Sequence, residues 1–256
     1  MKTITGMLLT ILILISVSGC SGSGSGKKSS DTENDTITAP DTGWTGIKKY
    51  YSNDYLIKEV TFKNSIRQGL MKSFYKGGQL YQTFWYENGV REDSAKWYYL
   101  EGQVFRSTPY KHDTIDGIQK QYFRNGKLKA ELGYSKGLRT QYFKEYTQAG
   151  KLIGGYPEII VSAKDDYNTR GTYRIGLELS DKATKVKFYR GEFTDGRFDT
   201  AKCKRINTVA GKGSLNLKKT GNPTASYVGI IAEIITGYGN KYLAYKKIEL
   251  PYADLN

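Results

Sequence analysis

Hydrophobic and polar residues recur along the middle of this chain with a period of 24 residues. In most copies two neighbouring aromatic residues precede a turn-forming residue by four and three places, and an apolar residue follows it by two. A fixed period of this length is typical of one supersecondary unit stacked on itself, so the chain is predicted to contain a repeat array. The turn-forming residues are Asp54, Gly78, Gly102, Gly126 and Gly150.

Each repeat is predicted to be a β-hairpin. The segments between turns are rich in aromatic and aliphatic residues, and no segment keeps apolar residues at helical spacing. Gly77-Gly78, Asn88-Gly89 and Asn125-Gly126 are typical of two-residue type I′ hairpin loops. We therefore expect an antiparallel β-meander over residues 46–156. A second column of turn residues follows the first by 11 places, at Ser65, Gly89, Asp113 and Gly137.

A two-residue loop at 77–78 would place residue 75 across from 80, 73 across from 82, and 71 across from 84. Because side chains alternate along a strand, this register predicts one apolar face, which includes Met71 and Trp97, and one polar face. The polar face repeats a lysine in every copy, at Lys48, Lys72, Lys96, Lys120 and Lys144. An aromatic residue stands two places after each lysine, at Tyr50, Phe74, Tyr98, Tyr122 and Tyr146.

These ten residues are the candidate ligand-binding site. Lysines two strands apart should stand about 9–10 Å from each other. Ammonium groups pair with phosphate or carboxylate, and aromatic rings stack on sugars, so an extended anionic polymer or glycan is the hypothesised ligand. The alternative is that the lysines only keep an exposed sheet face soluble. A different loop length would exchange the two faces.

A second all-β domain is predicted over residues 157–256, because the period ends near Pro157. About seven strands in roughly 100 residues favour a β-sandwich of the immunoglobulin-like type. The β-branched run from Gly229 to Ile235 favours a buried strand over a short helix. The expected strands include 159–161, 173–179, 186–188, 215–217, 227–235 and 242–250.

The N-terminus has the features of a secretory signal over residues 1–19. Lys2 precedes an apolar stretch, and small residues lead to Cys20. The Val-Ser-Gly-Cys ending resembles a bacterial lipoprotein signal, which implies cleavage before Cys20 and attachment of diacylglycerol to its sulfur. The alternative is an ordinary signal with an incidental cysteine. A lipid would hold the protein at a membrane without spanning it, and Ser21 favours the outer membrane over the inner. Residues 20–45 are expected to form a flexible tether.

Charge and residue usage narrow the function. The formal net charge is +14, and it is close to +13 after loss of Lys2 with the signal. Export argues against a nucleic-acid partner and favours anionic envelope polymers or lipid headgroups. With His112 as the one histidine and Cys203 as the one cysteine besides Cys20, we expect no enzyme activity, no cofactor, no metal site and no intramolecular disulfide. His112 falls in the second turn column and is interpreted as a turn residue.

The segment from Tyr122 to Leu128, Tyr-Phe-Arg-Asn-Gly-Lys-Leu, resembles the MORN-variant repeats of bacterial proteins. The resemblance covers residues 46–156 and implies a β-hairpin array; such proteins are often labelled antitoxin-like. The first copy departs from it with Asp54-Tyr55, and the last with Thr147, so both are expected to be edge copies.

Together these features favour a lipid-anchored envelope protein that binds an anionic polymer or glycan on its repeat face. The alternative is a protein–protein interaction or scaffold subunit of an envelope complex, which would dock a partner on the apolar repeat face or on the sandwich. A third hypothesis is an immunity-like, antitoxin-like protein.

Overall fold

A computed structural model describes residues 43–256. The expected signal, Cys20 and residues 20–42 of the expected tether lie outside the described residues. The described chain is nearly all β, with one helix, α1 (Tyr167–Arg170), and one 3-10 turn, Thr200–Lys202. Within this part of the chain, no helix is long and apolar enough to cross a membrane.

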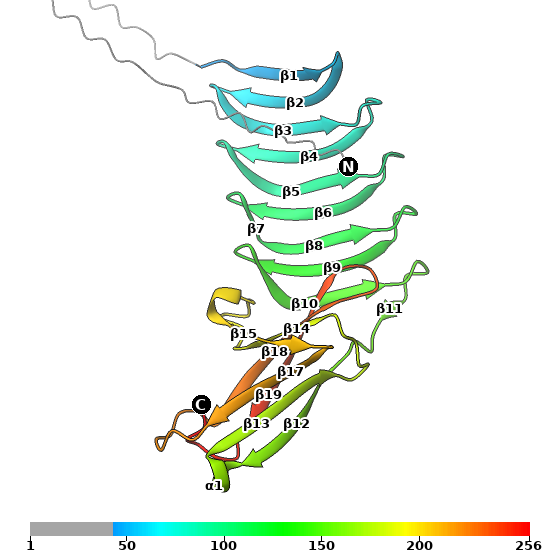
Figure 1. Ribbon diagram of the computed structural model, residues 1–256. Helices are drawn as coiled ribbons and strands as arrows, with labels where there is room; N and C mark the ends of the chain where they lie inside the picture. Colours follow the sequence, from blue (N-terminus) through cyan, green and yellow to red (C-terminus); the bar gives the residue numbers. More distant parts are fainter. Residues whose placement is uncertain (1–42) are drawn as a thin grey trace, which may run out of the picture. The chain divides into compact units, whose positions relative to one another are not determined.

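The repeats form one eleven-stranded antiparallel sheet in which strands follow each other in chain order (Figure 1). Only the short β7 leaves this path, because it pairs with β6 alone while β8 continues the sheet. The predicted meander is therefore confirmed. The strands are β1 (Gly46–Ser52), β2 (Tyr55–Lys63), β3 (Ile66–Phe74), β4 (Leu80–Glu87), β5 (Val90–Tyr98), β6 (Val104–Lys111), β7 (Thr114–Ile115), β8 (Gly117–Tyr122), β9 (Leu128–Ser135), β10 (Leu138–Tyr146) and β11 (Leu152–Ile153).

The two turn columns are built differently. In the second column two consecutive residues have positive φ, as at Asn88 (49°) and Gly89 (85°), which is the type I′ geometry that suits a two-residue hairpin. At the four glycines of the first column, which we call the glycine column, only the glycine has positive φ and the loop holds three residues. These glycines are Gly78, Gly102, Gly126 and Gly150. The prediction of two-residue loops at 77–78 and 125–126 is therefore wrong. Asn-Gly and Gly-Gly allow type I′ turns but do not require them.

The three-residue loop changes the pairing beside it. Gly78 N donates to Tyr75 O, and Tyr75 N donates to Gln79 O, which makes a turn closed by a left-handed glycine. A β-bulge follows, so Phe74 rather than Tyr75 pairs with Leu80. Beyond the bulge the predicted partners 73–82 and 71–84 are confirmed. The same backbone bonds recur 24 residues later, from Tyr99 N to Gln103 O.

The second part of the fold is a sandwich of two four-stranded antiparallel sheets. Their strand orders are β12-β13-β17-β16 and β15-β14-β18-β19. These orders match the A-B-E-D and C′-C-F-G sheets of an immunoglobulin-like sandwich, so this prediction is confirmed. The strands are β12 (Ile159–Asp166), β13 (Thr172–Leu179), β14 (Val186–Arg190), β15 (Lys204–Ile206), β16 (Thr208–Val209), β17 (Lys212–Lys218), β18 (Tyr227–Ile235) and β19 (Lys241–Glu249).

The sandwich core comes from alternate residues of both sheets. Ile175 and Leu217 from one sheet meet Phe188 and Ile230 from the other, and all four are fully enclosed. Gly229 to Ile235 lie in β18, so the strand interpretation of this β-branched run is confirmed. The apolar side chains buried in this core stabilise the sandwich, in which Cys203 is a free cysteine.

The glycine column gives a stability prediction. Gly102 has a φ of +95°, and an added Cβ would meet no atom within 4 Å, so Gly102→Ala adds backbone strain without a clash. We expect its free energy of unfolding to fall by about 1 kcal/mol, measured by urea denaturation. Gly154→Ala is the matched control, since Gly154 also lies in open space but lacks a left-handed φ. Equal losses in the two variants would contradict this explanation.

Candidate functional site

One straight row of side chains crosses nine strands of the repeat sheet. Cross-strand pairing places its members side by side, and we call them the lysine row. Neighbouring strands lie about 4.7–4.9 Å apart, so lysines on alternate strands are about 9–10 Å apart. The row is Lys49, Glu59, Lys72, Thr83, Lys96, Ser107, Lys120, Glu131 and Lys144.

Lys48 and Tyr50 do not belong to this row, contrary to the sequence prediction. Lys48 pairs with Val60 and Tyr50 pairs with Lys58, which places both on the opposite face of the sheet. The cause is the first hairpin, which has a two-residue loop at 53–54 where later copies have three residues. The missing residue moves β1 by one position, so Lys49 takes the place predicted for Lys48.

The first two lysines of the row share one carboxylate. Lys49 Nζ lies 3.7 Å from Glu59 Oε1, and Lys72 Nζ lies 3.8 Å from Glu59 Oε2. Ion pairs this long and this exposed contribute little to stability. They nevertheless lower the positive potential that this end of the row offers to an anion.

The last acid of the row is held by tyrosines. Tyr142 Oη and Tyr146 Oη each donate to Glu131 Oε2 at 3.1 Å. Burial, followed by the bond to Glu131, raises the pKa of Tyr146 above its ordinary value. Lys144 Nζ lies 5.4 Å from the centroid of the Tyr142 ring, within the range of a cation–π contact. This end of the row is thus engaged in contacts of its own.

The middle of the row is different. Within residues 43–256, Lys96 and Lys120 have no carboxylate within ion-pair distance, although Glu131 stands beside Lys120 in the row. The neutral Ser107 lies between the two lysines. A shallow depression of about 300 Å³ opens here, and its lining residues are Lys96, Val104, Ser107, Tyr122 and Gly126. The depression therefore lies in the middle of the row, with the ammonium-bearing Lys96 on its wall and Lys120 next to Ser107 across the strand pair.

Aromatic side chains lie on the lysine face beside the row. Tyr98 and Tyr122 are half-buried, and Tyr98 Oη lies 3.4 Å from Thr83 Oγ1 of the row. Trp85 lies two residues beyond Thr83 on the same strand face and is 41 % exposed. The predicted association of lysines with Phe74, Tyr98, Tyr122 and Tyr146 is therefore present on one face.

The sequence predicts that the opposite face is apolar, but this face also carries charged side chains. Met71, Ala95 and Trp97 are buried on it, but arginine side chains lie across its aromatic rings. Their distances from guanidinium carbon to ring centroid are 4.5 Å for Arg67 over Tyr86, 4.4 Å for Arg91 over Tyr110, 4.0 Å for Arg106 over Trp97 and 5.1 Å for Arg139 over Tyr134. Positions 67, 91 and 139 follow the 24-residue period, so the sequence period could have indicated these arginines.

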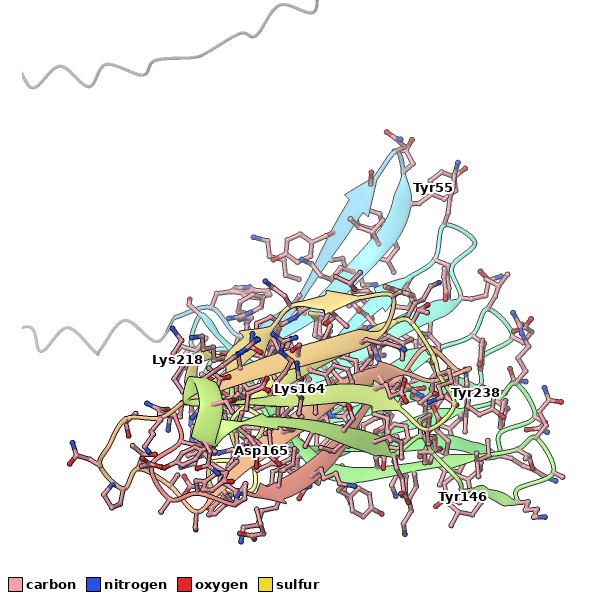
Figure 2. The ribbon with its side chains drawn as sticks, turned by 60° about the horizontal axis from the view of Figure 1, so that its bottom comes forward. Tyr55, Tyr146, Lys164, Asp165, Lys218 and Tyr238 are labelled. Carbon is pink, nitrogen blue, oxygen red and sulfur yellow. The ribbon has the colours of Figure 1, made fainter. Side chains whose placement is uncertain are left out.

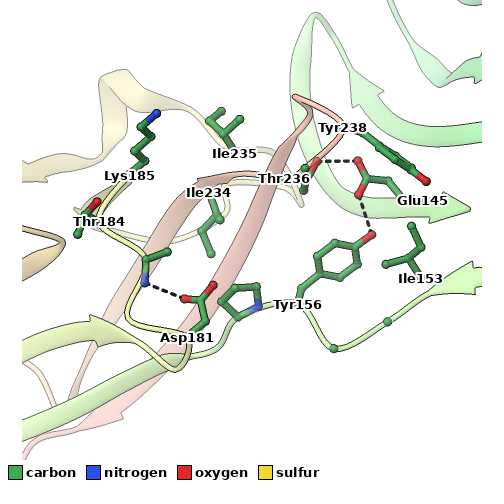
Figure 3. Close-up of a pocket in the computed structure, with 15 residues that line it drawn as sticks. Glu145, Ile153, Tyr156, Asp181, Thr184, Lys185, Ile234, Ile235, Thr236 and Tyr238 are labelled. Carbon is green, nitrogen blue, oxygen red and sulfur yellow. Dashed lines mark hydrogen bonds between the residues drawn. The ribbon is translucent and has the colours of Figure 1, made fainter. Parts of the chain in front are cut away.

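At the end of the array the sandwich lies against this opposite face. Glu145 is almost fully buried and accepts three hydrogen bonds. Figure 3 shows two of them, from Tyr156 Oη at 3.0 Å and from Thr236 Oγ1 at 2.7 Å. The third comes from Asn240 Nδ2 at 2.8 Å. Gln121 also donates to Asn240, at 2.8 Å. A buried carboxylate with three donors is well satisfied. The loop between β18 and β19 is thereby fastened to the last repeat.

A cleft with a volume of about 600 Å³ lies beside Glu145 (Figure 3). Its walls are the linker after β11, the loop before β14 and the end of β18. Glycines leave space in it, since a Cβ at Gly154 or Gly237 would meet nothing within 4 Å. Sequence reasoning missed the cleft. The one available signal was an acid at 145 where the preceding copies have Gln121 and Trp97.

Two further residues singled out from the sequence are accounted for locally. His112 has a φ of 48° and lies in the turn after β6, as predicted. Cys203 lies just before β15 and is half-buried, and burial raises the pKa of its thiol. A raised thiol pKa lowers the fraction of reactive thiolate.

Comparison with known protein families supports the repeat interpretation. The family described as MORN repeat variant matches residues 115–136, which include β8, its three-residue turn and β9. Comparisons with curated proteins and with solved structures find no match. The family match indicates a binding or scaffold role in general, and it specifies no ligand.

Tyr156→Phe tests the junction. It removes one bond to Glu145, so we expect the free energy of unfolding to fall by about 1 kcal/mol at pH 7. Burial, followed by the bond to Glu145, raises the pKa of Tyr156 above the ordinary 10.0. A raised pKa stabilises the folded state below pH 10, and this stabilisation is lost as pH rises further. The variant should therefore lose less stability between pH 10 and 11 than the unmodified protein in urea denaturation.

The matched control is Tyr51→Phe, because Tyr51 is 61 % exposed on the first hairpin. We expect it to leave both the stability at pH 7 and its alkaline decline unchanged. An alkaline decline of equal steepness in Tyr156→Phe and in the unmodified protein would show that the Tyr156 hydroxyl is not held by Glu145.

Proposed function

We propose that this protein is a lipid-anchored envelope protein that binds an extended anionic polymer or glycan along its lysine row. The observation that supports this best is the pair Lys96 and Lys120, which stand on one face without an ion-pair partner in the described chain. The neighbouring lysines Lys49 and Lys72 share Glu59. We therefore expect the ligand to bind mainly at Lys96 and Lys120, which we call the lysine-row centre, rather than along the whole lysine row.

The row suits a linear ligand with regularly spaced negative charges. Lys72, Lys96 and Lys120 repeat about every 9–10 Å along a straight line. Hydroxyl groups of Thr83 and Ser107 lie between them and can donate to or accept from a sugar or phosphate oxygen. A cationic face of this kind also attracts an anionic chain over a distance set by the ionic strength.

Aromatic rings extend the binding surface to sugars. Tyr98 and Tyr122 flank the lysines on the same face, and Trp85 presents an exposed indole. Rings of this kind provide apolar contact area for the faces of pyranose units. The combination favours an acidic glycan, such as a polyuronate, over a polymer of bare phosphates.

The second candidate function is a scaffold subunit that docks a partner on the apolar repeat face. Part of that face already contacts the protein's own sandwich, through Gln121 and Glu145. Arginine side chains also lie over its aromatic rings. These contacts leave the lysine face as the better supported binding surface.

The lysine pairs provide a direct test. Lys96→Gln with Lys120→Gln should weaken binding to polygalacturonate about ten-fold at low salt. The slope of log Kd against log salt concentration should also fall by about two, one for each lysine removed. Lys49→Gln with Lys72→Gln changes the net charge equally but removes lysines already paired with Glu59. Affinity measured by biolayer interferometry should change much less in this control. Equal losses for both pairs would show that only the overall charge matters.

The anchor is tested separately. Cys20→Ser should abolish incorporation of labelled palmitate in a bacterial host and release the protein from the membrane fraction. Binding of the purified variant to polygalacturonate should remain unchanged. Membrane retention and labelling equal to those of the unmodified chain would contradict the anchor without affecting the lysine-row proposal.

A further inference from the structure

The two ends of the repeat sheet differ. At the end formed by β10 and β11, the sandwich is attached through Glu145 and through Phe198 N, which donates to Arg139 O at 2.8 Å. At the other end is β1, and among residues 43–256 no strand pairs with its outer edge (Figure 1). A free edge presents a row of backbone donors and acceptors to any extended chain.

Exposed apolar side chains are concentrated at this edge. Ile47 is 58 % exposed and Tyr51 61 % exposed, both on β1, while Trp44 just before it is 52 % exposed. Tyr55 lies at the tip of the first hairpin (Figure 2) and is 45 % exposed. Single exposed apolar residues need no explanation, but a group of them along one free edge marks an interaction surface.

A depression deepens the surface next to the edge. It has a volume of about 450 Å³ and is lined by Trp44, Lys48, Phe62 and Ser65. Gly46 lies beside it and leaves the Trp44 ring uncovered, since a Cβ there would come within 2.9 Å of the indole. The depression is large enough to receive one apolar side chain of a strand added to β1.

The middle of the edge is positively charged. Lys48 and Lys49 are exposed on opposite faces of β1, and the nearest acid in register is Glu59, which Lys49 shares with Lys72. An added strand therefore meets one lysine on each face near its centre. Acidic residues at two consecutive central positions would place one carboxylate beside each lysine.

We propose that the outer edge of β1 binds an extended acidic segment of a partner protein, which adds a strand to the repeat sheet. Backbone hydrogen bonds to β1 supply the affinity, as in other cases of strand addition. Central acidic residues face Lys48 and Lys49, and an apolar residue fills the depression beside Trp44. This surface is separate from the lysine-row centre at Lys96 and Lys120.

A second copy of the chain fits the edge less well. Antiparallel pairing of two β1 strands about a two-fold axis centred on residue 49 sets the two Lys49 side chains opposite each other. Like charges directly opposite are destabilising in a sheet. The net charge of +14 on each chain adds to the repulsion.

Synthetic peptides test the proposal on the folded protein. The probe is a nine-residue peptide with two central glutamates flanked by valine, isoleucine and threonine, titrated by fluorescence polarisation. A second peptide has the same sequence with N-methyl groups on alternate residues, which removes backbone donors on one edge and keeps the charge. We expect binding of the first peptide and at least a ten-fold loss with the second.

Charge reversal provides the matched protein variant. Lys48→Glu with Lys49→Glu should weaken binding of the glutamate peptide about ten-fold, and a peptide with two central lysines should recover affinity for that variant. Hydrogen exchange of the bound protein should slow at the amides of Gly46–Ser52. Variants Lys96→Gln and Lys120→Gln should bind the peptide as the unmodified protein does.

Several results would overturn the proposal. Equal affinity for the N-methylated peptide would mean that binding depends on charge alone. Protection of amides elsewhere would place the peptide on another surface. A dimer in sedimentation velocity, abolished by the charge-reversed variant or by the glutamate peptide, would assign the edge to a second copy instead.

Discussion

The arrangement of the lysine row on the repeat sheet depends on the number of residues in each tight turn. Side chains alternate between the two faces of a strand, so one residue more or less in a turn moves every later residue of that strand to the other face. At the glycine turns a three-residue loop is followed by a one-residue bulge, and the two together keep Lys72, Lys96 and Lys120 on one face. The two-residue loop at 53–54 moves Lys48 away and brings Lys49 into the row.

Ion pairs and hydrogen bonds divide the lysine row into parts that differ in how much positive charge they offer to a ligand. Glu59 engages the first two lysines, and Glu131 accepts from two tyrosines at the other end. Between them Ser107 separates Lys96 and Lys120, which have no ion-pair partner within residues 43–256. A regular repeat thus produces an irregular potential, because the residues on the intervening strands differ from copy to copy. Binding is expected to concentrate where those residues are neutral.

A repeat array must also terminate, since each unit buries its surface against a neighbour. One end of this array terminates on the immunoglobulin-like sandwich, with the buried Glu145 holding Thr236 and Asn240. The other terminates at β1, whose outer edge pairs with no strand of the described residues and where Ile47 and Tyr51 are exposed. In the described part of the chain the sandwich covers one end of the opposite face, and the arginines stacked on its rings help to cover the rest.

The sequence alone determined the period, the hairpin unit, the antiparallel meander and the sandwich, because turn residues and alternation are local signals. It also determined that Lys72, Lys96, Lys120 and Lys144 share a face. The tertiary structure decided what local signals do not contain. Loop length at Asp54 exchanged Lys48 for Lys49. Contacts between distant segments buried Glu145 and opened the cleft beside it, and only cross-strand pairing revealed which lysines Glu59 neutralises.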